Sequence, residues 1–235
     1  MILNTPNMYL VLQPIEYMGR DTEYEVLTRI KGMMGAEGVI RSVIEGRREV
    51  DFDIEVLNTA LDTTPIKMKL AINLLPNTLE NLRVPDIMDS IIIGMGKSKS
   101  DITFEVSEDT NCESSNVLLN IQRFKNMGYR VALDDFSGRW SDFHLLEAIK
   151  PSIVKFDREL VGNSGVTSLV AQLNSSGMDT ILEGVESQED VRKAIEIGYR
   201  GLQGYFIGKP LPLKELKFGN GNSLDNMAVN FSYKD

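Results

Sequence analysis

Polar side chains recur at the ends of short apolar segments along this chain. The apolar run 131–133 ends in two consecutive acids, Asp134 and Asp135. Other strand-like segments end in, or close to, Asn73, Glu105, Lys155, Asp157, Glu183 and Gln203. If these strands lie parallel and side by side, their polar ends gather at one rim of the sheet. Carboxylates, an amide and a lysine at one rim predict a site for a divalent cation and a phosphate ester.

The types of ligand indicate which cation fits this rim. Mg²⁺ and Mn²⁺ prefer carboxylate, carbonyl and water oxygens, whereas zinc more often recruits His or Cys. The chain has one His and one Cys, which favours Mg²⁺ or Mn²⁺. Asp134 and Asp135 could serve two cations with one carboxylate bridging, and a cation pair stabilises both the attacking and the leaving oxygen of an in-line phosphoryl displacement. Without a cation, the carboxylates would repel one another and their pKa values would rise.

Each of these residues also has a structural interpretation. A single Glu at a strand end is usually a surface acid or a helix cap, and Asp134 with Asp135 could cap the next helix. Lys155 could bury its stem and keep its ammonium in water. Arg29 could be an ordinary surface cation, and Gln203 could pair with the backbone. The joint pattern favours a site, because unrelated surface acids would not all choose the same end of their strands.

The arrangement of the apolar runs predicts the fold. Runs 9–17 and 24–30 are joined by a short link that begins MGRD (18–21), too short for a crossover helix, so these two strands should pair antiparallel. Afterwards strands alternate with helices, which we expect over 38–61, 79–95, 114–127, 141–149, 159–176 and 187–197. Repeated βα units imply a parallel sheet, either closed or open and doubly wound. Eight runs in about 210 residues favour a modified TIM-type (β/α)8 barrel with one antiparallel strand. We expect one domain over 1–216 and a flexible polar tail over 217–235.

Composition excludes several classes of partner. The 25 Lys and Arg against 34 Asp and Glu give a net charge of −9, which argues against DNA, RNA or anionic lipid as a partner. A phosphate substrate stays compatible, because bound cations reverse the sign of the local field. The single Cys112 excludes an internal disulfide and is consistent with a reducing cytoplasm. No apolar stretch approaches the roughly 20 residues of a membrane span, and we expect a cytoplasmic protein.

Taken together, the separated motifs resemble those of the EAL-domain cyclic di-GMP phosphodiesterases over residues 9–213. They are QPI (13–15), EVLTR (25–29), INLLP (72–76), FEVSED (104–109), ALDDF (132–136), VKFD (154–157), EGVES (183–187) and QGYFIGKPLP (203–212). Val26 replaces the alanine that gives the family its name. The resemblance implies hydrolysis of cyclic di-GMP to linear pGpG with Mg²⁺ or Mn²⁺, in a barrel with two cations.

The resemblance also implies a role for each matching residue. The first cation would be bound by Glu25, Asn73, Glu105 and Asp134, with Asp134 bridging to a second cation that Asp135 also holds. Lys155 and Glu183 would position and activate the attacking water, with Glu183 as the general base, and Gln203 would support the water or the second cation. Substrate contacts would come from Gln13, Leu27, Arg29 and Asp157. Glu108 would anchor the loop after the fifth strand, and Glu186 would lie behind the metal ligands.

Two segments depart from the family pattern. The paired acids are followed by Phe136, Ser137, Gly138, Arg139 and Trp140, where the family usually has a Phe-Gly-Thr-Gly-like loop. In the family this loop couples metal binding to dimer contacts, so the resemblance implies a homodimer. The segment between Arg29 and residue 50 is also shorter than usual. The altered loop favours an alternative function, a catalytically weak or silent module that binds cyclic di-GMP or a protein partner as a regulator.

Overall fold

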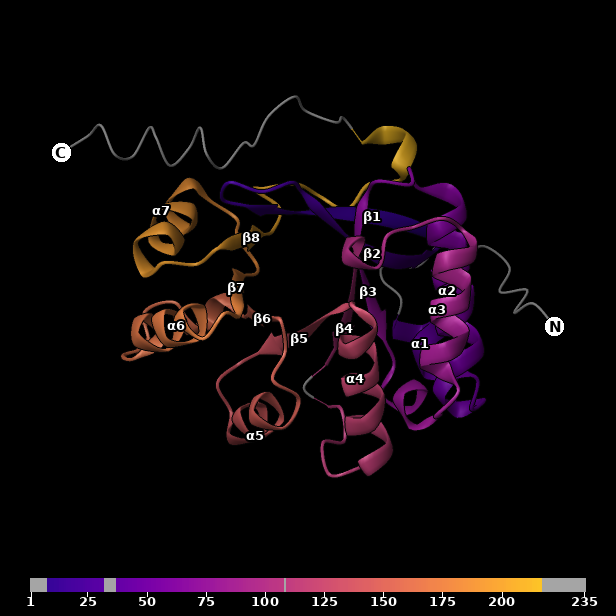
Figure 1. Ribbon diagram of the computed structural model, residues 1–235. Helices are drawn as coiled ribbons and strands as arrows, with labels where there is room; N and C mark the ends of the chain where they lie inside the picture. Colours follow the sequence, from indigo (N-terminus) through magenta and orange to yellow (C-terminus); the bar gives the residue numbers. More distant parts are fainter. Residues whose placement is uncertain (1–7, 32–36, 108, 217–235) are drawn as a thin grey trace.

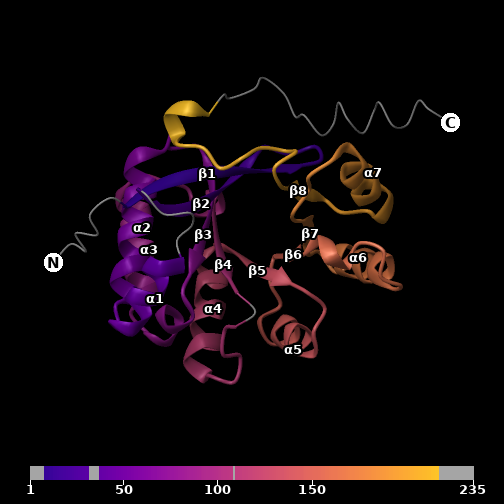
Figure 2. The same cartoon turned by 180° about the vertical axis from the view of Figure 1, so that it is seen from behind.

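Eight strands close into a barrel in the computed structural model, which describes residues 8–31, 37–107 and 109–216 (Figures 1 and 2). In chain order they are β1 (Met8–Tyr17), β2 (Glu23–Ile30), β3 (Lys69–Leu74), β4 (Ile102–Val106), β5 (Arg130–Phe136), β6 (Ile153–Phe156), β7 (Asp179–Leu182) and β8 (Gly201–Gln203). Strand β1 pairs antiparallel with both β2 and β8, and the other neighbouring pairs are parallel. The predicted barrel with one antiparallel strand is confirmed. Glu108 and the predicted tail 217–235 lie outside the described residues.

The helices surround the barrel (Figures 1 and 2). The α-helices are α1 (Glu37–Glu45), α2 (Glu49–Thr63), α3 (Val84–Gly94), α4 (Ser115–Met127), α5 (Trp140–Ile149), α6 (Val166–Ser175) and α7 (Gln188–Ile197). Short 3₁₀ turns are η1 (Pro76–Glu80), η2 (Lys99–Asp101), η3 (Arg158–Leu160) and η4 (Leu213–Glu215). None of these helices is both long and apolar enough to cross a membrane.

Three of the predicted helices are wrong in extent. The segment 38–61 forms two helices, because Arg47 adopts a positive φ of 52° between α1 and α2. The segment 79–95 starts within η1, and α3 begins only at Val84, with Pro85 in its first turn, where a missing N–H costs nothing. The segment 159–176 starts within η3, and Gly162 and Gly165, both at positive φ, separate η3 from α6.

Alternating side chains divide the core into two parts. Leu70 and Ile72 pack in the large cluster that includes helix residues, whereas Ala71 between them belongs to a small separate cluster. The same alternation holds on β5, where Ala132 lies in the small cluster and Leu133 in the large one. Since successive side chains of a strand point to opposite faces, the small cluster fills the inside of the barrel.

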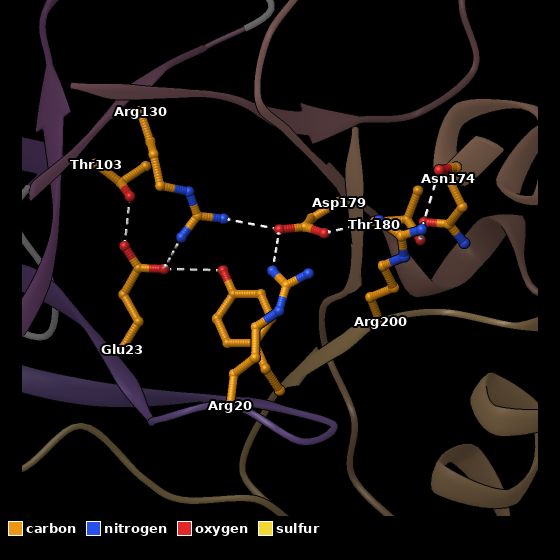
Figure 3. Close-up of polar contacts among 9 residues, drawn as sticks. Arg20, Glu23, Thr103, Arg130, Asn174, Asp179, Thr180 and Arg200 are labelled. Carbon is orange, nitrogen blue, oxygen red and sulfur yellow. Dashed lines mark hydrogen bonds and ion pairs between the residues drawn. The ribbon is translucent and has the colours of Figure 1, made fainter. Parts of the chain in front are cut away.

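An ion-pair network closes the barrel at the amino ends of its parallel strands (Figure 3). Arg130 lies between two buried carboxylates, with Nη1 3.3 Å from Glu23 Oε2 and Nη2 3.0 Å from Asp179 Oδ2. The Tyr17 hydroxyl donates to Glu23 Oε2 at 2.8 Å, and Arg20 Nη1 lies 2.6 Å from Asp179 Oδ2. We call this set the basal network; it comprises Tyr17, Arg20, Glu23, Thr103, Arg130, Asp179 and Arg200.

Candidate active site

The predicted polar residues converge at the opposite end of the barrel from the basal network. Their place follows from strand alternation, because residues two or four positions apart on one strand face the same side. On β4, Thr103 belongs to the basal network and Glu105 to the site; on β7, Asp179 belongs to the network, and Glu183 follows the strand in the site. Strands β4 and β7 therefore each supply one polar group to the closed end and another to the open end.

Lys155 lies at the centre of four carboxylates. Its Nζ is 2.7 Å from Asp134 Oδ1, 3.1 Å from Glu105 Oε1, 3.1 Å from Glu183 Oε1 and 3.8 Å from Glu25 Oε2. The Lys155 side chain is 1% exposed, so water screens these charges little. None of the four contacts has the direction of a hydrogen bond, so charge rather than a directed bond holds the ammonium.

Amide side chains fix the position of Glu25. Asn73 Nδ2 donates to Glu25 Oε1 at 2.8 Å, and Gln203 Nε2 donates to Glu25 Oε2 at 2.5 Å. Asn73 is the last residue but one of β3 and Gln203 is the last residue of β8, and these strands lie on either side of the β1–β2 pair in the closed barrel. Both amides therefore turn their oxygen atoms away from Glu25, where these oxygens are free to accept or to coordinate.

Burial shifts the ionisation of this cluster. It raises the pKa of Glu105 well above its usual range; the Lys155 ammonium opposes that rise, and neighbouring carboxylates add to it. The pKa of Glu183 is raised for the same reasons. Burial alone would lower the pKa of Lys155, but Asp134 and the other three carboxylates together raise it well above its usual value. Four carboxyl groups face one ammonium, so burial and mutual repulsion favour the protonated forms of Glu105 and Glu183.

The chemistry of the donor set fits divalent cations. Two groups of carboxylates have oxygens within 4.8 Å of one another, Glu25 with Glu105 and Asp134, and Asp134 with Asp135 and Glu183. Asp134 is common to both groups. Among the buried oxygens of the described residues, Glu105 Oε2, Glu183 Oε2 and Gln203 Oε1 accept no hydrogen bond. Buried oxygens without a donor are costly unless something cationic satisfies them, and an all-oxygen set suits Mg²⁺ or Mn²⁺.

A β-bulge places the two consecutive acids on the same side of the barrel mouth. Leu133 pairs with Val154 and Phe136 with Phe156, so β5 has one residue more than β6 between the two pairs. Asp135 supplies that extra residue, with a φ of 54°, a left-handed conformation that Asp and Asn adopt more readily than most residues. In a regular strand, Asp134 and Asp135 would point to opposite faces.

A cavity of about 260 Å³ opens beside the carboxylates. Of the residues predicted to touch substrate, Gln13 and Leu27 line it, and so do Glu183 and the predicted supporting acid Glu186. Tyr205, which the sequence analysis did not single out, also lines it and is 60% exposed. Its place two residues after Gln203 in the QGY motif was the available signal.

The other predicted substrate residues lie at neighbouring hollows. Arg29 and Asn73 line an adjacent, mainly apolar cavity of about 190 Å³, and Arg29 Nη1 donates to the carbonyl of Thr28 at 2.8 Å. Asp157 lines a third cavity with Asp135 and Glu183, and its side chain caps η3 by accepting from the backbone N–H of Glu159 at 2.7 Å. The structure therefore divides the predicted contacts among three hollows around one mouth.

The chain is similar in sequence to known proteins of one family. The family model described as EAL domain matches residues 2–210. The probable cyclic di-GMP phosphodiesterase PdeA of Escherichia coli K12 is 26% identical over 233 residues, which cover 91% of this chain and 32% of PdeA. The cyclic di-GMP phosphodiesterase RocR of Pseudomonas aeruginosa is 28% identical over 154 residues, 62% of this chain and 39% of RocR. The chain spans roughly a third of the length of these relatives.

Solved structures agree on the fold. The EAL domain of FimX from Pseudomonas aeruginosa bound to c-di-GMP superposes with a TM-score of 0.82 at 18% identity, covering 92% of this chain and 96% of that one. The PaMucR phosphodiesterase in complex with c-di-GMP gives a TM-score of 0.79 at 21% identity, covering 90% of this chain and 100% of that one. From the barrel, the motifs and the family match, the chain belongs to the EAL domain family.

Proposed function

We propose that this chain is a metal-dependent phosphodiesterase that hydrolyses cyclic di-GMP to linear pGpG. The observation that carries the proposal is the cluster of Glu25, Glu105, Asp134 and Glu183, in which the last three have oxygens that accept no hydrogen bond. Family membership supports the substrate, because relatives such as PdeA and RocR are named for cyclic di-GMP phosphodiesterase activity. The proposal includes a cytoplasmic setting and a homodimer.

The cluster divides into groups that would hold different cations. Glu25, Asn73, Glu105 and Asp134 would hold one Mg²⁺ or Mn²⁺, and Asp134 with Asp135 a second. When bound, such cations supply positive charge next to the phosphate, where negative charge develops in the transition state. These assignments follow the donor chemistry of the side chains.

The remaining residues act on water and on the substrate. Glu183 borders the cavity and its side chain is 20% exposed, compared with 1% for Glu105, so Glu183 is the carboxylate that can accept a proton from an attacking water. Lys155 balances the carboxylates and holds Glu183 in place. Gln13, Leu27 and Arg29 would contact the cyclic dinucleotide, with the Arg29 guanidinium suited to a phosphate oxygen.

A second candidate function is a module that binds cyclic di-GMP, or a protein partner, without turnover. One observation favours it: Lys155 already lies within 3.1 Å of three carboxylates and neutralises part of their charge. A protein that relied on this ammonium alone could bind its ligand without recruiting a cation. The altered loop 136–140 after the paired acids is consistent with this alternative.

Turnover in the presence of added metal tests the proposal. Incubation with cyclic di-GMP and Mg²⁺ or Mn²⁺ should yield pGpG on ion-exchange chromatography, and chelation should stop it. Glu25→Ala should lose both metal binding and turnover, whereas Asp21→Ala, an exposed acid at the opposite end of the barrel, should keep both. Ligand binding without pGpG would support the regulator, and full turnover by Glu25→Ala would show that the site is wrongly assigned.

A further inference from the structure

A buried carboxylate holds the segment that follows the paired acids. Asp142, in the first turn of α5, is fully buried. Its Oδ2 accepts from the backbone N–H of Ser137 at 2.9 Å, from the Ser137 hydroxyl at 3.0 Å and from the backbone N–H of Arg139 at 3.1 Å. Its Oδ1 accepts from the Ser141 hydroxyl at 3.2 Å and lies 3.5 Å from Arg139 Nε.

These contacts exceed what a helix cap requires. An acid in the first turn usually bonds the residue just before the helix, which here is Arg139. Asp142 also reaches Ser137, two positions further back and outside the helix. Burial would raise the pKa of Asp142, but hydrogen bonds from Ser137 and Arg139 outweigh it and lower the pKa, so the carboxylate is charged in the folded protein.

The held segment begins next to the bulge of β5. Phe136 returns to the strand ladder, opposite Phe156, and its carbonyl accepts from the N–H of Asp157 at 3.2 Å. Ser137, bound to Asp142, follows immediately. Asp135 has a left-handed backbone. On its amino-terminal side the chain is fixed by the pairing of Leu133 with β6, and on its carboxyl-terminal side by the contacts of Phe136 and Ser137. Loss of the second restraint would let the extra residue relax toward a right-handed conformation.

We propose that Asp142 is a positioning residue for Asp134 and Asp135, and so sets the geometry of the second cation site. The inference rests on the proposed function, in which these two acids hold that cation. Partners of metal-ligating residues orient the ligands, and their substitution typically weakens metal binding about 10- to 100-fold. In this chain the orienting carboxylate reaches the bulge from helix α5 through the backbone of Ser137.

Direct measurement of Mn²⁺ binding tests this role independently of turnover. Electron paramagnetic resonance counts free Mn²⁺ in a titration of wild type, Asp142→Ala, Asp142→Asn and Asp190→Ala. Asp142→Ala should lower the affinity for the more weakly bound of the two Mn²⁺ ions about 10- to 100-fold. Asp142→Asn keeps one carbonyl oxygen for the N–H groups of Ser137 and Arg139, so it should recover part of the affinity. Melting curves of each variant report whether it is folded.

Asp190 is the matched control, because it caps α7 in the same way. It accepts from the backbone N–H groups of Glu186 at 3.0 Å and Ser187 at 2.9 Å, after β7 rather than β5. Asp190→Ala should lower the melting temperature and leave Mn²⁺ affinity unchanged. Equal Mn²⁺ binding by wild type and both Asp142 variants would overturn this inference and leave the proposed function intact. Absence of Mn²⁺ binding by the wild type would overturn both.

Discussion

Glu105 and Glu183 are both strand-end acids in contact with Lys155, but their surroundings assign them different work. Glu105 lies inside β4 and is 1% exposed, so it can serve only a group that is itself inside the barrel mouth. Glu183 follows β7, borders the cavity and is 20% exposed. The difference in access to water therefore suits Glu105 to bind a cation and Glu183 to act as a general base, although both are glutamates.

The exposed position of Glu183 leads to a prediction about turnover. Glu183→Gln keeps the size of the side chain and removes the basic oxygen, so kcat for pGpG formation should fall about 10²- to 10⁴-fold. Binding of cyclic di-GMP, measured by calorimetry in Ca²⁺ buffer, should change much less. Glu186→Gln, at the same cavity but ion-paired with Arg158 at 2.5 Å, is the matched control and should retain most turnover. Equal kcat for wild type and Glu183→Gln would exclude Glu183 as the base.

Single residues show how far the sequence reaches. Acids at strand ends predicted that Glu105 and Asp134 gather at one mouth, the family resemblance added Glu25, and the structure brings their oxygens within 4.8 Å. The bulge at Asp135 was not predictable, because it depends on the register between β5 and β6, two strands far from each other in sequence. Asp142 was missed because a buried acid in an amphipathic segment resembles an ordinary cap.

At the scale of elements, the most informative pattern was the order and spacing of the strand-like and helix-like segments. The short link after run 9–17 correctly predicted that β1 and β2 pair antiparallel, since a crossover helix cannot fit there. Helix extents were harder, because apolar periodicity continues through the breaks at Arg47 and before Val84. Such breaks depend on backbone conformation at one or two residues, to which periodicity is insensitive.

Helix α2 holds the connection that follows β3 through two buried acids. Asp53 Oδ2 accepts from the backbone N–H of Leu75 at 2.8 Å, and Glu49 Oε1 accepts from Asn77 Nδ2 at 2.8 Å. Leu75 follows two residues after Asn73, so these contacts fix the end of the strand that carries a predicted metal ligand. A helix outside the barrel thereby restrains the end of a strand at the mouth.

The ionisation of Asp53 predicts a pH dependence of stability. Burial raises its pKa to about 7, whereas in the unfolded chain it is about 3.9. Its contribution is fully present below pH 3.9 and is lost as the pH rises through 7, by up to about 1.4 kcal/mol per pH unit. Asp53→Asn should therefore match the wild type near pH 4 and exceed its free energy of unfolding at pH 8.

Urea denaturation of both proteins between pH 4 and pH 8 measures this difference. Asp62→Asn, an exposed acid on the same helix, is the control and should follow the wild-type profile. Parallel profiles for Asp53→Asn and the wild type would mean that Asp53 is ionised in the folded protein across this range.

On the scale of the whole molecule, the two ends of the barrel differ in charge balance. The open end gathers carboxylates around one lysine, whereas the basal network sets three arginines against Glu23 and Asp179 (Figure 3). The open end therefore has capacity for added cations. At the closed end, the arginines neutralise the carboxylates, and this network stabilises the fold.

Asp179 joins three elements at the closed end, so its charge should decide stability in acid. It lies within 3.1 Å of Arg20, Arg130 and Arg200, and although burial opposes ionisation, hydrogen bonds from Arg20 and Arg200 lower its pKa. Because the folded pKa lies below the unfolded value of about 3.9, this contribution is present above that pH and lost as the pH falls through the folded pKa. Asp179→Asn should cost about 1.5–3 kcal/mol at pH 7, because the three guanidinium groups that lose their anion are themselves 27–49% exposed and water screens them.

Free energies of unfolding measured at acid pH and at neutral pH separate this effect from that of Asp53. Asp179 stabilises the fold as the pH rises from acid, whereas Asp53 destabilises it toward pH 7, so the two substitutions should shift the profile in opposite directions. Asp21→Asn removes an 86% exposed carboxylate 3.1 Å from Lys69 and should cost at most about 1 kcal/mol. If Asp179→Asn were as stable as Asp21→Asn at pH 7, the basal network would not be what holds the closed end together. A loss that is full above about pH 3.9 and shrinks as the pH falls further, with both proteins converging in acid, is the result that the arginine contacts require.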